Sequence, residues 1–437
     1  MKSFLLSLIK VNYHRLVINF SWQLLEKCVR MIVGLVVGTL TIRYLGVTQF
    51  GLLAYILSIT SIFQALISVG ADGVAVRLIA RKKELSNQIL GTLFRIRIFS
   101  GFACFLGSLV SIVFIGDIND TENLLLGLLI ASGMLFQAAD VINIWFQSQM
   151  QGKYIFIVKA SSYLIICSAK ICFILWNFSI YAFAATYSIE AFLSAALFII
   201  YYRFYRTEKA WSWNLRYANI LLRQGIPVMA AAFLLVFYAQ IDRIMLAKLS
   251  SVYEVGLFSS ALTLTTYLNF LPLLLCISLA PLLAKAKNKV QQILLYSSLL
   301  RTIIWPSLFF TLVLFIFSDF LILMLYGDAY TESAGSLRVL SLTIPLIGIG
   351  VVGEYFALNT SRTYLIFIKS IFSLFFSITL NFLILPTLGA VGASYVMLIT
   401  SIVNLVIVCL LLPNFFGALM VSLSLTRLFR ILVSIKY

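Results

Sequence analysis

The sequence predicts an all-α membrane protein with about twelve transmembrane helices, arranged as two six-helix halves. Three observations support this fold class. The chain is 62% hydrophobic, well above the value for soluble domains. Apolar runs close to the ~20 residues of a spanning helix recur from end to end. The connections between these runs alternate between basic and acidic, as short loops on opposite sides of a membrane do.

The apolar runs give the expected spans in chain order. In the first half they cover residues 17–42, 50–70, 91–115, 123–146, 154–176 and 178–201. In the second half they cover residues 226–247, 256–279, 293–317, 335–358, 364–385 and 391–412. The sequence therefore divides into a first half (1–202), a cytoplasmic connection (203–224), a second half (225–412) and a cytoplasmic amphipathic tail (413–437).

The charge of the connections predicts the orientation. One set is basic, with examples at Arg81, Lys82 and Lys83, whereas the other is poor in Lys and Arg and holds acids such as Asp319 and Glu332. This alternation places both termini in the cytoplasm and requires an even number of spans. It also accounts for the net charge of +17, so the sequence gives no support for a nucleic-acid partner.

Three pairs of similar segments relate the two halves. LGVTQFGLLAY (45–55) corresponds to LSSVYEVGLFSSA (249–261), YIFIVK (154–159) to YLIFIK (364–369), and FAATY (183–187) to VGASY (391–395). All three lie a little over 200 residues apart. Six helices per repeat give parallel repeats, which is a transporter architecture with its substrate expected between the halves.

Charged residues inside the expected spans are the candidate functional residues, because each costs at least ~2.5–3.5 kcal/mol in a bilayer unless it faces a cavity or a partner. The candidate substrate-binding cations are Lys27, Arg30, Lys159, Lys170, Arg243 and Lys369. The candidate acids for ion coupling or charge compensation are Glu26, Asp140, Glu190, Asp242 and Glu354.

The first span carries the densest of these clusters. Glu26 and Arg30 are four residues apart and share a helix face, whereas Lys27 is turned about 100° away from Glu26. One acid compensates only part of this positive charge, and a cationic excess in a cavity indicates an anionic substrate group such as phosphate or diphosphate.

Other interpretations of these charges remain open. Glu26 and Arg30 would also serve as a purely structural pair, and Asp242 and Arg243 would neutralise each other. The cations nearest the cytoplasmic ends would reach the lipid headgroups through their long side chains. These are Arg95, Arg97, Arg301, Lys159 and Lys369.

The sequence gives little basis for an enzyme. His14 is the only histidine and precedes the first span, the six cysteines lie within apolar segments, and no metal-ligand spacing is present. A membrane glycan polymerase is the remaining enzymatic alternative, but such proteins usually carry a large outer loop and lack a twofold repeat. Separately, Pro272, Pro306 and Pro345 lie inside expected spans and predict kinks.

One stretch resembles a known family. RYLGVTQFGLLAYILSITSIFQALISVGADGVAVRLIARKK (43–83) is similar to the opening segment of bacterial O-antigen and polysaccharide repeat-unit flippases. In those proteins R-Y-L-G ends the first helix, F-G-L opens the second, and a glycine followed by basic residues closes it. The length, the number of helices and the two halves are similar too. The resemblance implies a MATE-like fold, in the multidrug/oligosaccharidyl-lipid/polysaccharide exporter superfamily.

The resemblance also implies a function. Such a protein moves an undecaprenyl-diphosphate-linked oligosaccharide from the cytoplasmic to the periplasmic leaflet of the bacterial inner membrane, for O-antigen, lipopolysaccharide or other polysaccharide biosynthesis. No cofactor is expected beyond a coupling H⁺ or Na⁺. Membrane lipids, a polysaccharide polymerase and a chain-length regulator are the expected partners. The rival is a multidrug/cation antiporter of the same fold, which would favour acids in its cavity, whereas bases outnumber acids within these spans.

Overall fold

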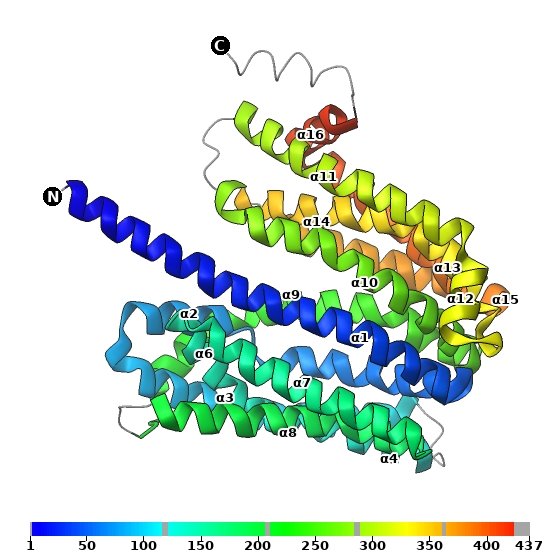
Figure 1. Cartoon of the computed structure of the whole chain (residues 1–437), viewed down its shortest axis with the longest axis horizontal. Helices are drawn as coiled ribbons and strands as arrows, with labels where there is room; N and C mark the ends of the chain where they lie inside the picture. The colour runs from blue at the N-terminus through cyan, green and yellow to red at the C-terminus, as the bar shows by residue number, and fades with distance from the viewer. Residues whose placement is uncertain (1, 116–120, 206–209, 284–288, 361–363, 424–437) are drawn as a thin grey trace. The chain divides into compact units, whose positions relative to one another are not determined.

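The computed structural model describes residues 2–115, 121–205, 210–283, 289–360 and 364–423, and every regular element in these ranges is a helix (Figure 1). The all-α prediction is confirmed for this part of the chain. Of the predicted tail, residues 413–423 form a helix, and residues 424–437 lie outside the described residues.

The first half of the sequence forms one long helix and a series of shorter ones. The elements are α1 (Lys2–Ile67), α2 (Asp72–Arg81), η1 (Lys83–Leu85), α3 (Ser86–Ile115), α4 (Thr121–Ala131), α5 (Gly133–Phe136), η2 (Gln137–Asp140), α6 (Val141–Ser148), α7 (Gly152–Leu175) and α8 (Ile180–Tyr205).

The second half continues in the same way. Its elements are α9 (Leu215–Leu249), α10 (Val252–Leu283), α11 (Lys289–Ile316), α12 (Ser318–Tyr326), η3 (Asp328–Tyr330), α13 (Ser333–Ser341), α14 (Thr343–Asn359), α15 (Tyr364–Leu411) and α16 (Pro413–Leu423). Because α9 begins at Leu215, residues 215–224 of the predicted connection are helical.

The number of spans agrees with about twelve once two bends are considered. In the described part of the chain, nine helices are long and apolar enough to cross a membrane, and the bent pair α13–α14 makes ten. Two of the ten are long enough for two spans each and contain a glycine with non-helical dihedrals, Gly46 in α1 and Gly389 in α15. Each glycine lies between two expected spans, and counting both sides of each bend raises ten to twelve.

Pro345 explains the 42° bend between α13 and α14. A proline has no backbone N–H, so the carbonyl four residues earlier, that of Ser341, loses its helical partner. The hydroxyl of Thr311 on α11 donates a hydrogen bond to this carbonyl at 2.9 Å. The prediction of a kink at Pro345 is therefore confirmed, and a neighbouring helix satisfies the freed backbone group.

The expected span 123–146 is present as one membrane-length segment, Thr121–Ser148, but its helix is interrupted at Ser132 and narrows to a 3₁₀ turn at η2. It is divided into α4, α5, η2 and α6. Ser188 of α8 supports the first break, because its hydroxyl donates to the Leu129 carbonyl and accepts a hydrogen bond from the Ser132 hydroxyl at 2.8 Å. The break thus depends on a side chain from another helix, which periodicity within the span does not reveal.

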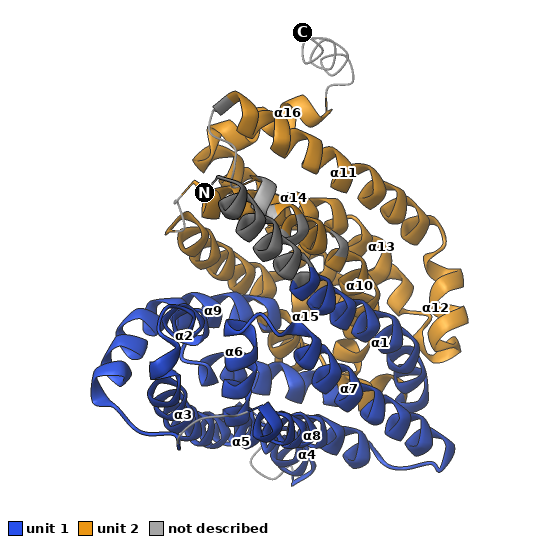
Figure 2. Ribbon diagram, turned by 60° about the vertical axis from the view of Figure 1, so that its left-hand side comes forward, with its two compact units in different colours: residues 1–45, 52–240 blue, residues 46–51, 241–437 orange. Residues whose placement is uncertain are grey.

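Contacts between Cα atoms divide the chain into two compact units (Figure 2). Unit 1 comprises residues 1–45 and 52–240, and unit 2 comprises residues 46–51 and 241–437. Unit 1 contains a core under α2 and α6, built on residues such as Ile79, Leu90 and Val141. Unit 2 contains a core between α10, α11, α14 and α16, built on residues such as Cys276 and Phe415.

Two glycines in unit 2 occupy equivalent positions of the sequence repeat. A Cβ atom on Gly51 would overlap the carbonyl oxygen of Val252, and a Cβ atom on Gly256 would overlap the carbonyl oxygen of Val47. The second member of each equivalent pair lies 205 positions after the first (47 to 252 and 51 to 256). The repeat found in the sequence is therefore also present as a reciprocal backbone contact.

Candidate functional site

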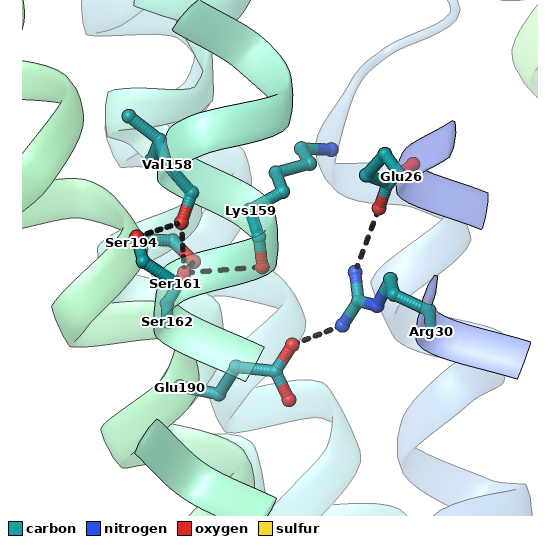
Figure 3. Close-up of polar contacts among 8 residues, drawn as sticks. All are labelled: Glu26, Arg30, Val158, Lys159, Ser161, Ser162, Glu190 and Ser194. Atoms are coloured by element: carbon teal, nitrogen blue, oxygen red, sulfur yellow. Dashed lines mark hydrogen bonds and ion pairs between the residues drawn. The ribbon is translucent and has the colours of Figure 1, made fainter. Parts of the chain in front are cut away.

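Arg30 is the centre of a charged cluster in unit 1, on the part of α1 that contains the first expected span (Figure 3). Its Nη1 lies 3.6 Å from Oε1 of Glu26, one turn earlier on the same helix. Its Nη2 forms an ion pair with Oε1 of Glu190, which α8 contributes. The predicted pairing of Glu26 with Arg30 is confirmed, and the second carboxylate is a partner that the sequence does not reveal.

Aromatic rings complete the surroundings of these cations. The guanidinium of Arg30 lies over the ring of Tyr163, with its carbon 4.6 Å from the ring centroid. The ammonium of Lys170 lies over the ring of Tyr187 at 5.0 Å. A cation over an aromatic face is stabilised by the ring quadrupole at little entropic cost, so α7 and α8 hold both charges inside the unit.

Lys159 lies on α7 one turn before Tyr163, and its side chain extends towards α1 in Figure 3. Its ammonium makes no ion pair with any residue in the described ranges. Beside it, the hydroxyls of Ser162 and Ser194 are 2.9 Å apart and link α7 to α8. Unit 1 thus combines a paired cation, a cation over a ring and a cation without a carboxylate.

The structure does not bring Lys27 and Asp140 into this cluster. Lys27 is exposed on α1, and Asp140 is half-buried at the end of η2. Among the described residues, neither forms a hydrogen bond or an ion pair with another candidate. The functional roles predicted for both remain predictions.

Asp242 is the most enclosed of the candidate acids and belongs to unit 2. Asp242 belongs to α9 and is 8% exposed. Its Oδ1 accepts hydrogen bonds from Ser377 Oγ at 2.9 Å and from Asn381 Nδ2 at 2.7 Å, both on α15. Asn381 is fully buried, and its Oδ1 accepts no hydrogen bond within the described residues.

Arg243 and Asp242 form hydrogen bonds with different helices. The Nε of Arg243 donates a hydrogen bond to the hydroxyl of Ser259 on α10 at 3.1 Å. Consecutive helical residues are about 100° apart, so one helix presents the acid to α15 and the base to α10. Arg243 nevertheless interacts electrostatically with Asp242, so the alternative of mutual neutralisation stays open.

Lys369 and Glu354 form an ion pair between α15 and α14. Lys369 begins a polar stripe along α15, because Ser373, Ser377 and Asn381 follow at intervals of four residues. Ser373 donates to Oδ1 of Asn404. The stripe leads from the Lys369–Glu354 pair to Asp242, the shared partner of Ser377 and Asn381.

The repeat places Lys159 and Lys369 at equivalent positions, but their surroundings differ. Lys369 has the carboxylate of Glu354, whereas Lys159 has none among the described residues. The charges of the two units are therefore not equivalent, and unit 1 has more uncompensated positive charge around its equivalent lysine.

Sequence analysis missed Tyr163, Tyr187, Ser377 and Asn381, because uncharged residues are not unusual in a span. A signal for three of them was present: Tyr163 lies four residues after Lys159, and Ser377 and Asn381 continue the four-residue spacing from Lys369. The interpretation of Arg97 as a cation that reaches the headgroups is wrong. Arg97 is 4% exposed and forms an ion pair with Asp72 of α2.

Comparison with known proteins agrees with the fold and the sequence resemblance. The sequence profile of a family described as "Polysaccharide biosynthesis protein" matches residues 16–287, which is more than half of the chain. No curated protein sequence matches the chain.

Several solved structures are similar over nearly the whole chain. The lipid II flippase MurJ in an inward closed conformation superposes with a TM-score of 0.73 at 14% identity, covering 93% of this chain and 91% of that one. An inward-facing multidrug resistance MATE family transporter of the MOP superfamily gives 0.74 at 15% identity, covering 90% and 94%. A MOP superfamily transporter from Pyrococcus furiosus, described with a binding pocket of reversed polarity, gives 0.63 at 16% identity, covering 93% and 94%. The MATE-like fold is confirmed.

Proposed function

The chain belongs to the polysaccharide biosynthesis protein family, and from this premise we propose that it is a lipid-linked oligosaccharide flippase. Its substrate would be an undecaprenyl-diphosphate-linked repeat unit of O-antigen or another polysaccharide. The protein would move this unit from the cytoplasmic to the periplasmic leaflet of the inner membrane by alternating access. The family match and the transporter fold support transport rather than enzymatic catalysis.

The observation that carries this proposal is the cationic cluster of unit 1. Arg30, Lys159 and Lys170 lie on helices that are long and apolar enough to span a membrane. Cations at such positions are retained at a cost of at least ~2.5–3.5 kcal/mol each, unless they face a polar path or a partner. A diphosphate that must cross the low-dielectric region is a partner whose charge the cluster as a whole would compensate.

The location and the partners follow from the same proposal. The protein is a multi-pass membrane protein, and we place it in the bacterial inner membrane with both termini in the cytoplasm. A polysaccharide polymerase and a chain-length regulator would act on the units that it delivers to the outer leaflet.

A multidrug/cation antiporter is the second candidate, because MATE transporters share the fold. A cavity for cationic drugs would hold an excess of acids. Here the candidate residues are six bases against five acids, and Glu26 and Glu190 both contact a base. The balance favours an anionic substrate.

Reconstituted vesicles test the proposal directly. The purified full chain in liposomes would be supplied with a fluorescent undecaprenyl-diphosphate oligosaccharide, and quenching from outside would report how much lipid changes leaflet. We expect Arg30→Ala to abolish this movement, because it removes the cation with the most contacts. Arg95→Ala is the matched control, since Arg95 is exposed and outside the cluster.

Cells provide the second measurement. Without the protein, lipid-linked repeat units should accumulate on the cytoplasmic leaflet and surface polysaccharide should be lost. Normal polymerisation in its absence, or transport of cationic drugs but not of the lipid by the vesicles, would refute the flippase assignment and favour the antiporter.

We further propose Asp242 as the group that couples transport to a proton or sodium gradient. The carboxylate of Asp242, the hydroxyl of Ser377 and the unfilled Oδ1 of Asn381 are oxygen atoms, which are the ligands that hard cations prefer. A proton on the carboxylate of Asp242 would serve the same purpose.

Asp242→Asn tests this assignment, because it keeps the shape and removes the charge. We expect the variant to bind the lipid but to lose any dependence of the transport rate on an imposed pH or sodium gradient. A gradient dependence equal to that of the unchanged protein would exclude Asp242 as the coupling group. The nature of the effective gradient would distinguish the proton from sodium.

A further inference from the structure

Both terminal nitrogens of Arg30 face a carboxylate in this structure. Nη2 is hydrogen-bonded to Glu190, Nη1 lies 3.6 Å from Oε1 of Glu26, and the face of the guanidinium lies on Tyr163. A diphosphate that binds both terminal nitrogens of Arg30 therefore competes with these carboxylates, and above all with the hydrogen-bonded Glu190.

The two carboxylates differ in how easily they can be displaced. Glu26 is one turn from Arg30 on α1, so it moves with Arg30 whenever α1 moves. Glu190 is 160 residues away in sequence and lies on α8, so its pairing with Arg30 depends on how the two helices are placed. The side chain of Glu190 is also more exposed than that of Glu26, 23% against 12%.

A displaced Glu190 has a second cation within reach. Lys170 lies over the ring of Tyr187, and Tyr187 is three residues before Glu190 on the same face of α8. Cys167, one turn before Lys170 on α7, lies within electrostatic range of Arg30, Lys170 and Glu190 together. The cluster therefore contains an alternative partner for the released carboxylate.

Resting on the flippase function proposed above, we propose that Glu190 is an internal substitute for the substrate diphosphate. In the empty site it occupies Arg30. When the diphosphate binds, Glu190 leaves Arg30 and pairs with Lys170, so that no carboxylate is left uncompensated in a low-dielectric site. On release, Glu190 returns to Arg30 and displaces the product. Glu190 is thus a positioning residue, and Lys170 is a receiver for Glu190 rather than a contact of the substrate.

This exchange of Glu190 between Arg30 and Lys170 would give the site an intermediate affinity for the diphosphate. A free guanidinium would hold a diphosphate through several charge-assisted hydrogen bonds and release it slowly. An internal competitor weakens binding and speeds release, which suits a carrier that must let its cargo go on the other side. Removing the competitor should therefore improve binding and impair turnover.

The test measures binding of undecaprenyl diphosphate, without sugar, to the purified full chain in lipid nanodiscs, together with the vesicle transport rate. We expect Glu190→Gln to bind about tenfold more tightly, since a charge-assisted contact no longer competes, and to transport more slowly at saturation. Glu190→Asp keeps the charge on a shorter side chain. Its affinity for undecaprenyl diphosphate should lie between that of the unchanged protein and that of Glu190→Gln. Glu84→Gln removes the same charge from an exposed residue of η1 and is the matched control.

A double-mutant cycle with Lys170→Met separates the two roles of the lysine. If Lys170 acts through Glu190, its loss weakens binding in the unchanged protein and has no effect in the Glu190→Gln background. An equal loss in both backgrounds would mean a direct contact with the diphosphate and would overturn the role assigned to Lys170.

The binding measurements distinguish a failure of the role assigned to Glu190 from a failure of the flippase function. If the unchanged protein binds the lipid diphosphate while the Gln and Asp variants, folded by gel filtration and thermal unfolding, bind it no more tightly, Glu190 is not a competitor. If neither the unchanged protein nor any variant binds it, the flippase proposal itself fails.

Discussion

Single charges in this protein depend on partners from other helices. Lys369 and Glu354 form an ion pair in unit 2, with side chains that are 12% and 32% exposed. Arg338 and Asp319 form another pair in the same unit, but their side chains are 44% and 68% exposed. The contribution of the two pairs to stability should differ accordingly, because water screens the second pair more than the first.

Neutralising one member of each pair tests this difference. We expect Lys369→Met to destabilise the protein by roughly 1–3 kcal/mol, because it leaves a carboxylate without its cation. Arg338→Met should cost less than about 1 kcal/mol. Thermal unfolding in detergent, followed by tryptophan fluorescence, measures both.

The double variant Lys369→Met/Glu354→Gln provides the check. It removes both charges, so much of the lost stability should return. If it is as unstable as Lys369→Met alone, packing of the lysine stem and not the unpaired acid is the cause.

At the residue scale, the sequence predicts local pairs and not distant ones. Glu26 and Arg30 were predicted to pair because they are four residues apart on one helix. Glu190 lies inside an expected span and is a candidate acid for that reason, but its partner is 160 residues away. Nothing in the spacing of one helix reports which residue of another helix faces it. Arg97 was misjudged for the same reason, because Asp72 lies on a separate short helix.

At the scale of the helices, a glycine and a remote carboxylate shape the bend in α15. Gly389 has φ +52°, a conformation that a side chain disfavours. Directly after it, the N–H of Ala390 donates to Oε2 of Glu254, on α10, at 2.7 Å. Glu254 thus caps the second part of α15 and places a negative charge at a helix N-terminus, where the helix dipole favours it.

Replacement of the two bend glycines should have unequal effects. Gly46, with φ +71° and ψ 171°, has open space around a built Cβ, so Gly46→Ala should cost only the backbone strain of about 1–3 kcal/mol. At Gly389 the Cβ would lie 2.6 Å from Oε2 of Glu254, so Gly389→Ala should cost more. Thermal unfolding of the two variants gives the comparison.

Truncation of Glu254 separates the steric cost of Gly389→Ala from its backbone strain. In a Glu254→Ala background, Gly389→Ala should cost about as much as Gly46→Ala, because the carboxylate is gone. Equal costs of Gly389→Ala with and without Glu254 would show that the contact with the carboxylate does not limit the bend.

The sequence predicts the bends better than the breaks. The expected spans 17–42 and 50–70 lie on either side of Gly46, and 364–385 and 391–412 lie on either side of Gly389, because turn residues interrupt the apolar runs there. Pro345 also predicts the bend between α13 and α14. The sequence does not predict the interruption between α4 and α5, because that interruption is supported by Ser188 from α8.

At the scale of the whole molecule, the number of spans decides where the chain ends lie. Ten spans by length, with one more for each of two bends, give an even number within the described residues. An even number returns the chain to the side on which it began. The basic connections predict that this side is the cytoplasm.

Reporter fusions test this topology. We expect a fluorescent protein at the C-terminus to fold and fluoresce in the cytoplasm, and alkaline phosphatase at the same place to be inactive. Alkaline phosphatase inserted after Asp328, in an acidic connection, should be active. Activity at both positions would mean that one predicted span does not cross the membrane.

The glycine contact in unit 2 has a further consequence. Gly51 lies against the carbonyl of Val252, and Gly256 lies against the carbonyl of Val47. A contact in which each side offers the same atoms to the other is called isologous, and it is what a twofold axis produces between identical subunits. The segments 47–51 and 252–256 thus meet within one polypeptide as the two subunits of a homodimer would, which is the form expected if a six-helix ancestor paired with itself before its gene was duplicated and fused.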